Sequence, residues 1–177
     1  MRILITSDHA GFELRKALYS HLKDAGKDVS DSGPYENNPD DDYPDFIAPV
    51  ALEVSHDPNN TRAIIIGGSG QGEAIMANRF PRVRAVVFNG QYAPHGRETP
   101  DEIYYSRMHN DANVISLGAR FISIEEAIAA VDKWLNTPFS NEERHVRRIK
   151  KIEQLAPQNA LSDTLEDRGD SSVIHDF

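Results

Sequence analysis

The chain has 177 residues, with 28 acidic side chains against 19 basic ones and no cysteine. This length allows one domain with a substantial core, and the lack of cysteine excludes disulfides, thiolate zinc sites, iron–sulfur clusters and a cysteine nucleophile. The net charge of −9 argues against a nucleic-acid partner, and no apolar run is long enough to suggest a membrane partner.

The chain begins with a predicted strand over residues 3–6, without the layout of a signal peptide, and this predicts a cytoplasmic location. Apolar residues at helical spacing predict a helix over 11–25 that ends at Gly26. A weak strand over 27–31 leads into a loop over 32–44, which three prolines keep irregular. Helical spacing returns over 45–56.

The clearest strand covers residues 62–66, which are apolar in succession, as in a strand buried on both faces. A glycine-rich turn over 67–72 then leads into a short predicted helix over 73–79. Two further strands are predicted over 83–88 and 113–117, with residues 106–111 treated as a loop between them. Capping-box sequences at Ser123 and Ser140 predict helices that extend to about residues 135 and 155.

Five strands that alternate with helices predict an α/β fold, a three-layer sandwich whose parallel sheet is covered on both faces. We expect one domain over residues 1–156 and a polar, acidic, poorly ordered tail over 157–177. In such sheets ligands bind where the strands end. The loops that follow the first, third, fourth and fifth strands are therefore the places to look for a site.

The acidic charge is concentrated in two segments, residues 36–45 with −5 and residues 157–177 with −4, which together account for the whole net charge. The rest of the chain is therefore neutral overall. We interpret the first segment as a solvated loop and the second as part of the tail. This distribution leaves room for a local positive site on a protein that is acidic as a whole.

The residues that follow the first strand are Ser7, Asp8 and His9. Their position fits a helix N-cap and a ligand site equally well. The turn after the third strand, Gly67 to Glu73, has four glycines in six residues, which let backbone N–H groups approach an anion. It matches neither the dinucleotide fingerprint nor the P-loop. It is either an anion cradle that holds Ser69 and Glu73, or simply a tight strand–helix turn.

Further candidates are His109, which on its own is more simply a loop residue, and Arg120 at the end of the fifth strand. Arg144 and Arg148 lie four residues apart on one helix face, where they suit a phosphate or a solvated mixed-charge surface. No metal-ligand spacing is apparent, and we expect neither a metal nor another cofactor. A carboxylate, a hydroxyl, two histidines and several arginines suit proton transfer on a small phosphorylated substrate.

Taken together, the chain resembles the ribose-5-phosphate isomerase type B family, which includes galactose-6-phosphate isomerase subunits. The resemblance covers about residues 1–155. It rests on the segments 7–11, 42–44, 67–73, 77–79, 84–87 and 109–113, and on Arg144, His145 and Arg148.

The resemblance implies a Rossmann-like homodimer or dimer of dimers that interconverts aldose and ketose phosphates without a metal, with its site at the subunit interface. It implies that Glu73 is the base, in the branch of the family that uses glutamate instead of cysteine, and that Ser69 acts beside it. His109 would assist ring opening and Asp8 would line the site, with Tyr43 on the sugar hydroxyls. The implied substrate and phosphate contacts are His9, Gly68, Gly70, Gly72, Asn110, Arg120, Arg144 and Arg148.

The expected substrate pair is ribose 5-phosphate and ribulose 5-phosphate. The segment 89–103 is longer than the usual spacing of the family, which keeps open a six-carbon substrate such as galactose 6-phosphate or allose 6-phosphate. A phosphosugar-binding protein without turnover is a third possibility, because a cradle and arginines can bind without a base.

Overall fold

The protein is described by a computed structural model over residues 1–91 and 101–156. A five-stranded sheet in the order β2-β1-β3-β5-β4 forms its centre, and every pair of neighbouring strands is parallel. The strands are β1 (Arg2–Ser7), β2 (Val29–Asp31), β3 (Thr61–Gly67), β4 (Ala85–Phe88) and β5 (Val114–Gly118). The predicted α/β fold with five parallel strands is therefore confirmed.

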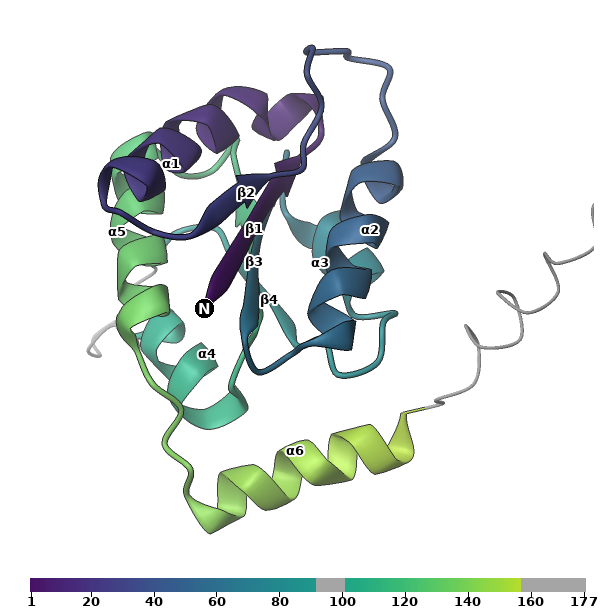
Figure 1. Ribbon diagram of the computed structural model, residues 1–177, viewed down its shortest axis with the longest axis vertical. Helices are drawn as coiled ribbons and strands as arrows, with labels where there is room; N and C mark the ends of the chain where they lie inside the picture. Colours follow the sequence, from purple (N-terminus) through teal and green to yellow (C-terminus); the bar gives the residue numbers. More distant parts are fainter. Residues whose placement is uncertain (92–100, 157–177) are drawn as a thin grey trace, which may run out of the picture.

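Helices cover both faces of this sheet, which gives the three predicted layers (Figure 1). The helices are α1 (Phe12–Asp24), α2 (Tyr43–His56), α3 (Gln71–Ala77), α4 (Glu102–Asn110), α5 (Ile124–Asn136) and α6 (Glu143–Leu155), with a short 3₁₀ turn, η1 (His9–Gly11), before α1. None of the helices within the described ranges has the length and apolar character needed to cross a bilayer.

Within the described ranges, the core consists of two clusters, one on each face of the sheet, because the side chains of a strand alternate between the two faces. Ile3 and Ile5 of β1 belong to a cluster with residues of α1 and α5, whereas Leu4 belongs to a cluster with residues of α2 and α3. Because successive strand residues point to opposite faces, a strand that is apolar at every position is buried on both sides. This explains why the apolar run over 62–66 is the strongest strand signal in the sequence.

The helix α4 is the element that the sequence does not predict, since residues 106–111 were expected to form a loop. Asp101 caps this helix by accepting a hydrogen bond from the Tyr104 backbone N–H at 2.9 Å. Its buried residues are Ile103, Ser106 and Arg107, so two of the three positions on its inner face are polar. An apolar period therefore does not mark it.

The two predicted capping boxes differ in outcome. Ser123 and Glu126 form the reciprocal pair at the start of α5, as predicted. At Ser140 the predicted helix is confirmed and ends at Leu155, but the predicted capping box is wrong, because α6 begins at Glu143 and its N-cap residue, Glu142, makes no side-chain cap. The Ser140 hydroxyl instead contacts Nδ1 of His145 at 2.8 Å.

The ends of other elements shift by one to three residues from the predicted ones. The helix α2 begins at Tyr43 with Pro44 in its first turn, where a proline needs no N–H partner, so the predicted loop over 32–44 is slightly shorter. Most of the long segment 89–103 and the whole tail 157–177 lie outside the described residues, so those two predictions stay predictions.

Candidate active site

Most of the predicted site residues lie at the edge of the sheet where the strands end, here called the C-terminal edge. The strands that follow β1 and β3 in the chain lie on opposite sides of this central pair, with β2 beside β1 and with β5 and β4 on the side of β3. This is the switch point at which open α/β sheets bind ligands. The segments that follow β1, β3 and β5 lie there, and they carry Asp8, His9, Ser69, Glu73 and Arg120.

Asp8 is buried directly after β1, with 7% of its surface exposed. Its Oδ1 accepts a hydrogen bond from the Gly11 backbone N–H at 3.1 Å, which makes it the N-cap of η1. Asp8 is thus both a cap and a member of the site, so the two interpretations of this loop are compatible. Its negative charge raises the pKa of both Glu73 and His9.

Glu73 is buried in the first turn of α3, with 4% of its surface exposed. Its carboxylate lies over Gly67, so closely that a Cβ atom on that glycine would be 1.8 Å from Oε1. Burial raises the pKa of Glu73, and the charge of Asp8 adds to this, while a hydrogen bond from its own backbone N–H opposes it. A carboxylate with a raised pKa is a better proton acceptor, as a catalytic base requires.

The turn before Glu73 is held open by its backbone. Gly70 has φ of +71°, a conformation that side chains rarely adopt, and its carbonyl accepts a hydrogen bond from the Ser116 hydroxyl at 2.6 Å. Ser69 lies half-buried in the turn, and its Oγ accepts a long bond of 3.4 Å from the Gln71 N–H. The N–H groups and the hydroxyl of this turn are therefore placed beside Glu73.

Arg120 and Tyr43 border the same turn. The Arg120 backbone N–H donates to the Gly68 carbonyl at 3.1 Å, and its guanidinium lies over Gly68, 3.1 Å from where a Cβ atom would stand. The Tyr43 ring lies against Gly72 in the same way, at 2.9 Å. The turn that carries Glu73 is therefore bordered by a cation and a phenol.

His9 has a hydrogen-bond partner that the sequence does not predict. Its Nδ1 lies 2.6 Å from Oδ1 of Asp41, in the acidic segment that was expected to be a solvated loop. The Asp41 side chain is only 7% exposed, so for this residue the expectation was wrong. No local sequence signal distinguishes Asp41 from Asp40 and Asp42, both of which are exposed.

Asp8, His9 and Asp41 are also the residues of the described chain that could together hold a metal ion, with ligand atoms within 4.8 Å of one another. Their arrangement fits a metal poorly. Nδ1 of His9 is already engaged by Asp41, and the His9 side chain feels the positive charge of Arg120. The group is better explained as a hydrogen-bonded ion pair.

The remaining predicted residues lie at the opposite edge, where the strands begin, here called the N-terminal edge. His109 and Asn110 end α4, a few residues before β5 starts at Val114. Arg144 and Arg148 are in α6, which lies below this edge in Figure 1. With strands of five to seven residues, the two edges are about 15–20 Å apart. The structure therefore does not bring these residues to Glu73 within one chain.

His145 of α6 contacts His109 of α4 at this edge. The sequence marks it only as part of the motif that includes Arg144 and Arg148. It is 1% exposed, and its ring lies 4.3 Å from the His109 ring, measured between centroids. Burial lowers the pKa of His145, and the charges of His109, Arg144 and Arg148 lower it further, while Glu142 opposes them. His145 therefore favours the neutral form beside His109.

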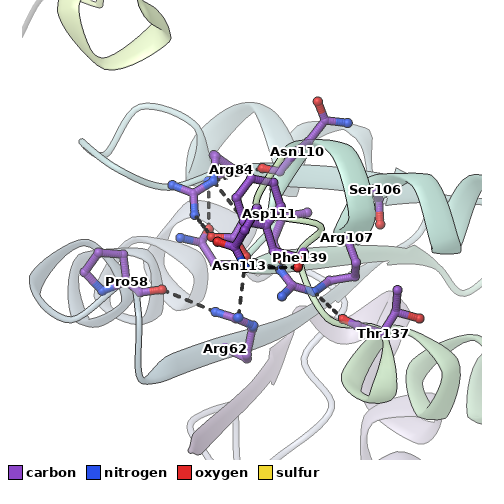
Figure 2. Close-up of polar contacts among 12 residues, drawn as sticks. Pro58, Arg62, Arg84, Ser106, Arg107, Asn110, Asp111, Asn113, Thr137 and Phe139 are labelled. Carbon is purple, nitrogen blue, oxygen red and sulfur yellow. Dashed lines mark hydrogen bonds and ion pairs between the residues drawn. The ribbon is translucent and has the colours of Figure 1, made fainter. Parts of the chain in front are cut away.

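Next to Asn110, Asp111 forms the centre of a cluster of three arginines (Figure 2). Its carboxylate lies 2.8 Å from Arg107, 2.9 Å from Arg84 and 3.7 Å from Arg62. Burial lowers the pKa of Arg62 to about 10, and the nearby Arg107 and Arg84 add to this while Asp111 opposes it. The same guanidinium groups also donate hydrogen bonds to backbone carbonyls. The cluster is therefore structural and fixes the turn between α4 and β5.

Comparison with known proteins places these observations in one family. Residues 3–152 match the family described as Ribose/Galactose Isomerase. A ribose-5-phosphate isomerase B of Mycolicibacterium paratuberculosis is 39% identical over 150 residues, 84% of this chain and 87% of that protein. The ribose-5-phosphate isomerase B of Escherichia coli is 34% identical over 151 residues, 85% of this chain and 93% of that protein.

Solved structures agree with the sequence relatives. Ribose-5-phosphate isomerase B from Mycoplasma genitalium, solved with bound ribulose-5-phosphate, superposes with a TM-score of 0.79 at 35% identity, covering 86% of this chain and 94% of that one. The enzyme from Clostridium thermocellum superposes with a TM-score of 0.76 at 38% identity, covering 87% and 96%.

Proposed function

The chain belongs to the ribose/galactose isomerase family, and on this basis we propose that it interconverts ribose 5-phosphate and ribulose 5-phosphate. The observation that carries the proposal is the buried Glu73 carboxylate, set in a glycine-rich turn at the switch point of the sheet. Relatives that share at least 34% of their residues over most of their length are ribose-5-phosphate isomerases, and one was solved with ribulose-5-phosphate bound.

The reaction moves one proton between neighbouring carbons of the open-chain sugar. Glu73 removes the proton from C2 of the aldose, and the electron pair of that C–H bond forms the C1–C2 double bond while the carbonyl pair moves to O1. The resulting enediolate then takes the proton from Glu73 at C1, and the O2 proton moves to O1, directly or through solvent, as the C2 carbonyl forms. This balance requires no oxidant and no metal, in line with the expectation of a cofactor-free reaction.

Each group of the C-terminal edge has a task in this scheme. The N–H groups of Gly68, Gly70 and Gly72, with the Ser69 hydroxyl, face the oxygens on which negative charge develops. Tyr43 contacts sugar hydroxyls, and burial raises the pKa of Glu73 with an added effect from the charge of Asp8. His9 and Arg120 bind the phosphate. The glutamate at the proposed base position, in a chain without cysteine, supports the proposal that the chain is of the glutamate-base branch of the family.

The site is completed by a second copy of the chain. His109, Asn110, Arg144 and Arg148 lie at the N-terminal edge and cannot reach the substrate held by Glu73 of their own chain. The helix α6 exposes apolar side chains, with Ile152 56% and Leu155 74% exposed. A homodimer that covers this face also places His109 for ring opening and the two arginines at the partner's phosphate. Residues 1–156 act in this scheme as one isomerase domain.

The proposal is tested by replacing the base. We expect Glu73→Gln to lose about 2 to 4 powers of ten in kcat for ribose 5-phosphate, because a missing general base costs that much. The amide keeps the size of the side chain, so the fold is preserved. Glu125→Gln, at an exposed position in the first turn of α5, is the matched control and should retain wild-type turnover.

Near wild-type turnover of Glu73→Gln would refute the assignment of the base. A panel of five- and six-carbon sugar phosphates, compared by kcat/KM on the wild-type protein, tests the substrate. Higher kcat/KM on galactose 6-phosphate or allose 6-phosphate would contradict the five-carbon assignment. Binding of ribose 5-phosphate with no isomerisation on any substrate would mean a binding protein.

A further inference from the structure

Asp41 is a buried carboxylate in a segment that is otherwise exposed and acidic. Its side chain is 7% exposed, although its neighbours Asp40 and Asp42 are both exposed. Withdrawing a carboxylate from water is unfavourable unless charged or hydrogen-bonding groups compensate it. Within the described residues only Oδ1 has hydrogen-bond partners, while Oδ2 is buried without one, so the contacts of Oδ1 indicate what this residue does.

Both side-chain contacts of Asp41 are with His9. Oδ1 accepts a hydrogen bond from the His9 backbone N–H at 3.3 Å and lies 2.6 Å from Nδ1 of the ring. An ionised carboxylate only accepts hydrogen bonds, so the proton of this contact belongs to Nδ1. The ring nitrogen left for a ligand is then Nε2, on a side chain that is 29% exposed.

The charges that face His9 come from three elements. The hydrogen bond that His9 donates to Asp41, in the loop before α2, is the largest cause that raises its pKa, and the negative charges of Asp8, at the end of β1, and of Asp41 add to it. Burial and the positive charge of Arg120, after β5, lower the pKa, and the net direction is upward. The imidazolium form has Nε2–H as a second donor, which an anion requires and which the neutral Nδ1–H tautomer lacks.

The loop that carries Asp41 is fastened to the body of the protein. The Ser32 backbone N–H donates to the Ile5 carbonyl at 2.9 Å. The buried Arg15 donates to the Pro34 carbonyl at 2.6 Å. Close to Asp41 itself, its backbone N–H donates to the Asn38 carbonyl at 3.1 Å. Asp41 is therefore brought to His9 by a defined turn.

We propose that Asp41 is a positioning residue that holds His9 as the imidazolium, with Nδ1–H donated to Asp41, and so presents Nε2–H to the anionic group of the substrate. The inference rests on the proposed function in taking that group to be a phosphate. Asp41 itself does not touch the substrate in this scheme. It acts by fixing the orientation and the charge of the imidazole.

The direct test is an NMR titration of the ring nitrogens of His9 in the full-length protein. In the wild type we expect a protonated Nδ1 across the titration and a pKa above that of an ordinary histidine. In Asp41→Asn the pKa of His9 should fall, because the amide lacks the negative charge. The amide oxygen can still accept the hydrogen bond from the His9 backbone N–H. Asp40→Asn is the matched control, because it removes the same charge at an exposed position one residue away from Asp41. It should leave the titration of His9 unchanged.

The functional test uses inorganic phosphate as the probe, measured by calorimetry between pH 6 and 9. Phosphate affinity supported by the His9 cation is present at low pH and is lost as the pH rises through the pKa of His9. We expect Asp41→Asn to bind phosphate about tenfold more weakly near neutral pH, the scale of weakening one charge-assisted hydrogen bond. The ionisation of phosphate itself affects both proteins equally, so it cancels when their phosphate affinities are compared at the same pH. The ratio of the wild-type affinity to the variant affinity should approach one at the acid end.

The proposal is overturned if Asp41→Asn titrates His9 as the wild type does, or if it binds phosphate as tightly as Asp40→Asn. Should Asp41→Asn fail to fold, Asp41→Ser provides a smaller acceptor for the same backbone N–H and is held to the same criteria. Lack of isomerisation by the wild-type protein would instead refute the proposed function, while the titration and the phosphate affinities would still decide the role of Asp41.

Discussion

At the scale of single residues, Asp8 connects the two kinds of chemistry in the site. One buried charge raises the pKa of Glu73, the proposed base, and also that of His9, the proposed phosphate contact. For Glu73 this strengthens the base, and for His9 it favours the cation. Asp8 can do both because it is fixed as the N-cap of η1, between the two groups.

We predict that Asp8→Asn shifts the whole pH profile of kcat/KM to lower pH. The acid limb moves because Glu73 ionises more easily without a neighbouring negative charge, and the alkaline limb moves because His9 loses its proton more easily. Asparagine is also a good N-cap, so η1 is retained. Profiles from pH 4.5 to 9.5, normalised to their maxima, check this.

Asp45→Asn, at an exposed position in the first turn of α2, is the control for the Asp8 variant and should keep the wild-type profile. If both limbs of the Asp8→Asn profile stay in place, then Asp8 does not set the charge of either group.

At the scale of elements, the turn between α4 and β5 decides where His109 and Asn110 lie. Asp111 occupies this turn in the left-handed region, with φ of +44°, and holds three arginines from the starts of β3 and β4 and from α4. Arg107 also donates to the Ala112 and Thr137 carbonyls, at 2.6 and 3.2 Å. The cluster therefore ties α4 to the chain that leads into α6.

We predict that Asp111→Asn lowers the free energy of unfolding by about 1–3 kcal/mol, measured by urea denaturation. Removing one partner leaves partly buried guanidinium groups without their counter-charge, and the partial exposure of Asp111 moderates the cost. Asparagine tolerates the left-handed conformation, so the loss reports the charge and not the backbone.

Asp28→Asn, at an exposed position just before β2, is the control and should change the stability by less than about 0.5 kcal/mol. A loss for Asp111→Asn no larger than that of the control would contradict a structural role of the cluster.

At the scale of the whole molecule, the proposed active site is divided between two edges of one sheet. Glu73 and its neighbours lie where the strands end, while His109, Arg144 and Arg148 lie where they begin. The sandwich cannot fold these edges together, because the strands that separate them are the core. A second copy of the chain is the simplest source of the missing groups, and α6 exposes apolar residues for such a contact.

We predict that two inactive variants, Glu73→Gln and His109→Asn, restore activity to each other when co-expressed or refolded together. In a randomly assorted mixture half of the dimers are mixed, and each mixed dimer has one intact site, so about a quarter of wild-type activity is expected. Light scattering on the same samples establishes the oligomeric state. Activity no higher than the average of the separate variants, or an active monomer, would contradict a shared site.

The fold could be predicted closely because its signals are local. The apolar run at 62–66, the glycines after it and the capping box at Ser123 each act within a few residues, and each marks its element correctly. The helix α4 escaped prediction because polar residues, Ser106 and Arg107, occupy much of its buried face. At Ser140 the local pattern places the cap wrongly, because the helix begins at Glu143 and the Ser140 hydroxyl contacts Nδ1 of His145 and the Glu142 backbone N–H.

By itself, the sequence determined the layered α/β fold and the glycine-rich turn at Gly67 to Glu73, while its resemblance to the family, together with the lack of cysteine, predicted glutamate as the candidate base. Only the tertiary structure decided which candidates share an edge of the sheet, since that depends on strand order and direction. It alone also showed that Asp41, 32 residues from His9, is buried against that ring while Asp40 and Asp42 stay exposed. Local patterns specify elements, but contacts between distant residues follow from how the elements pack.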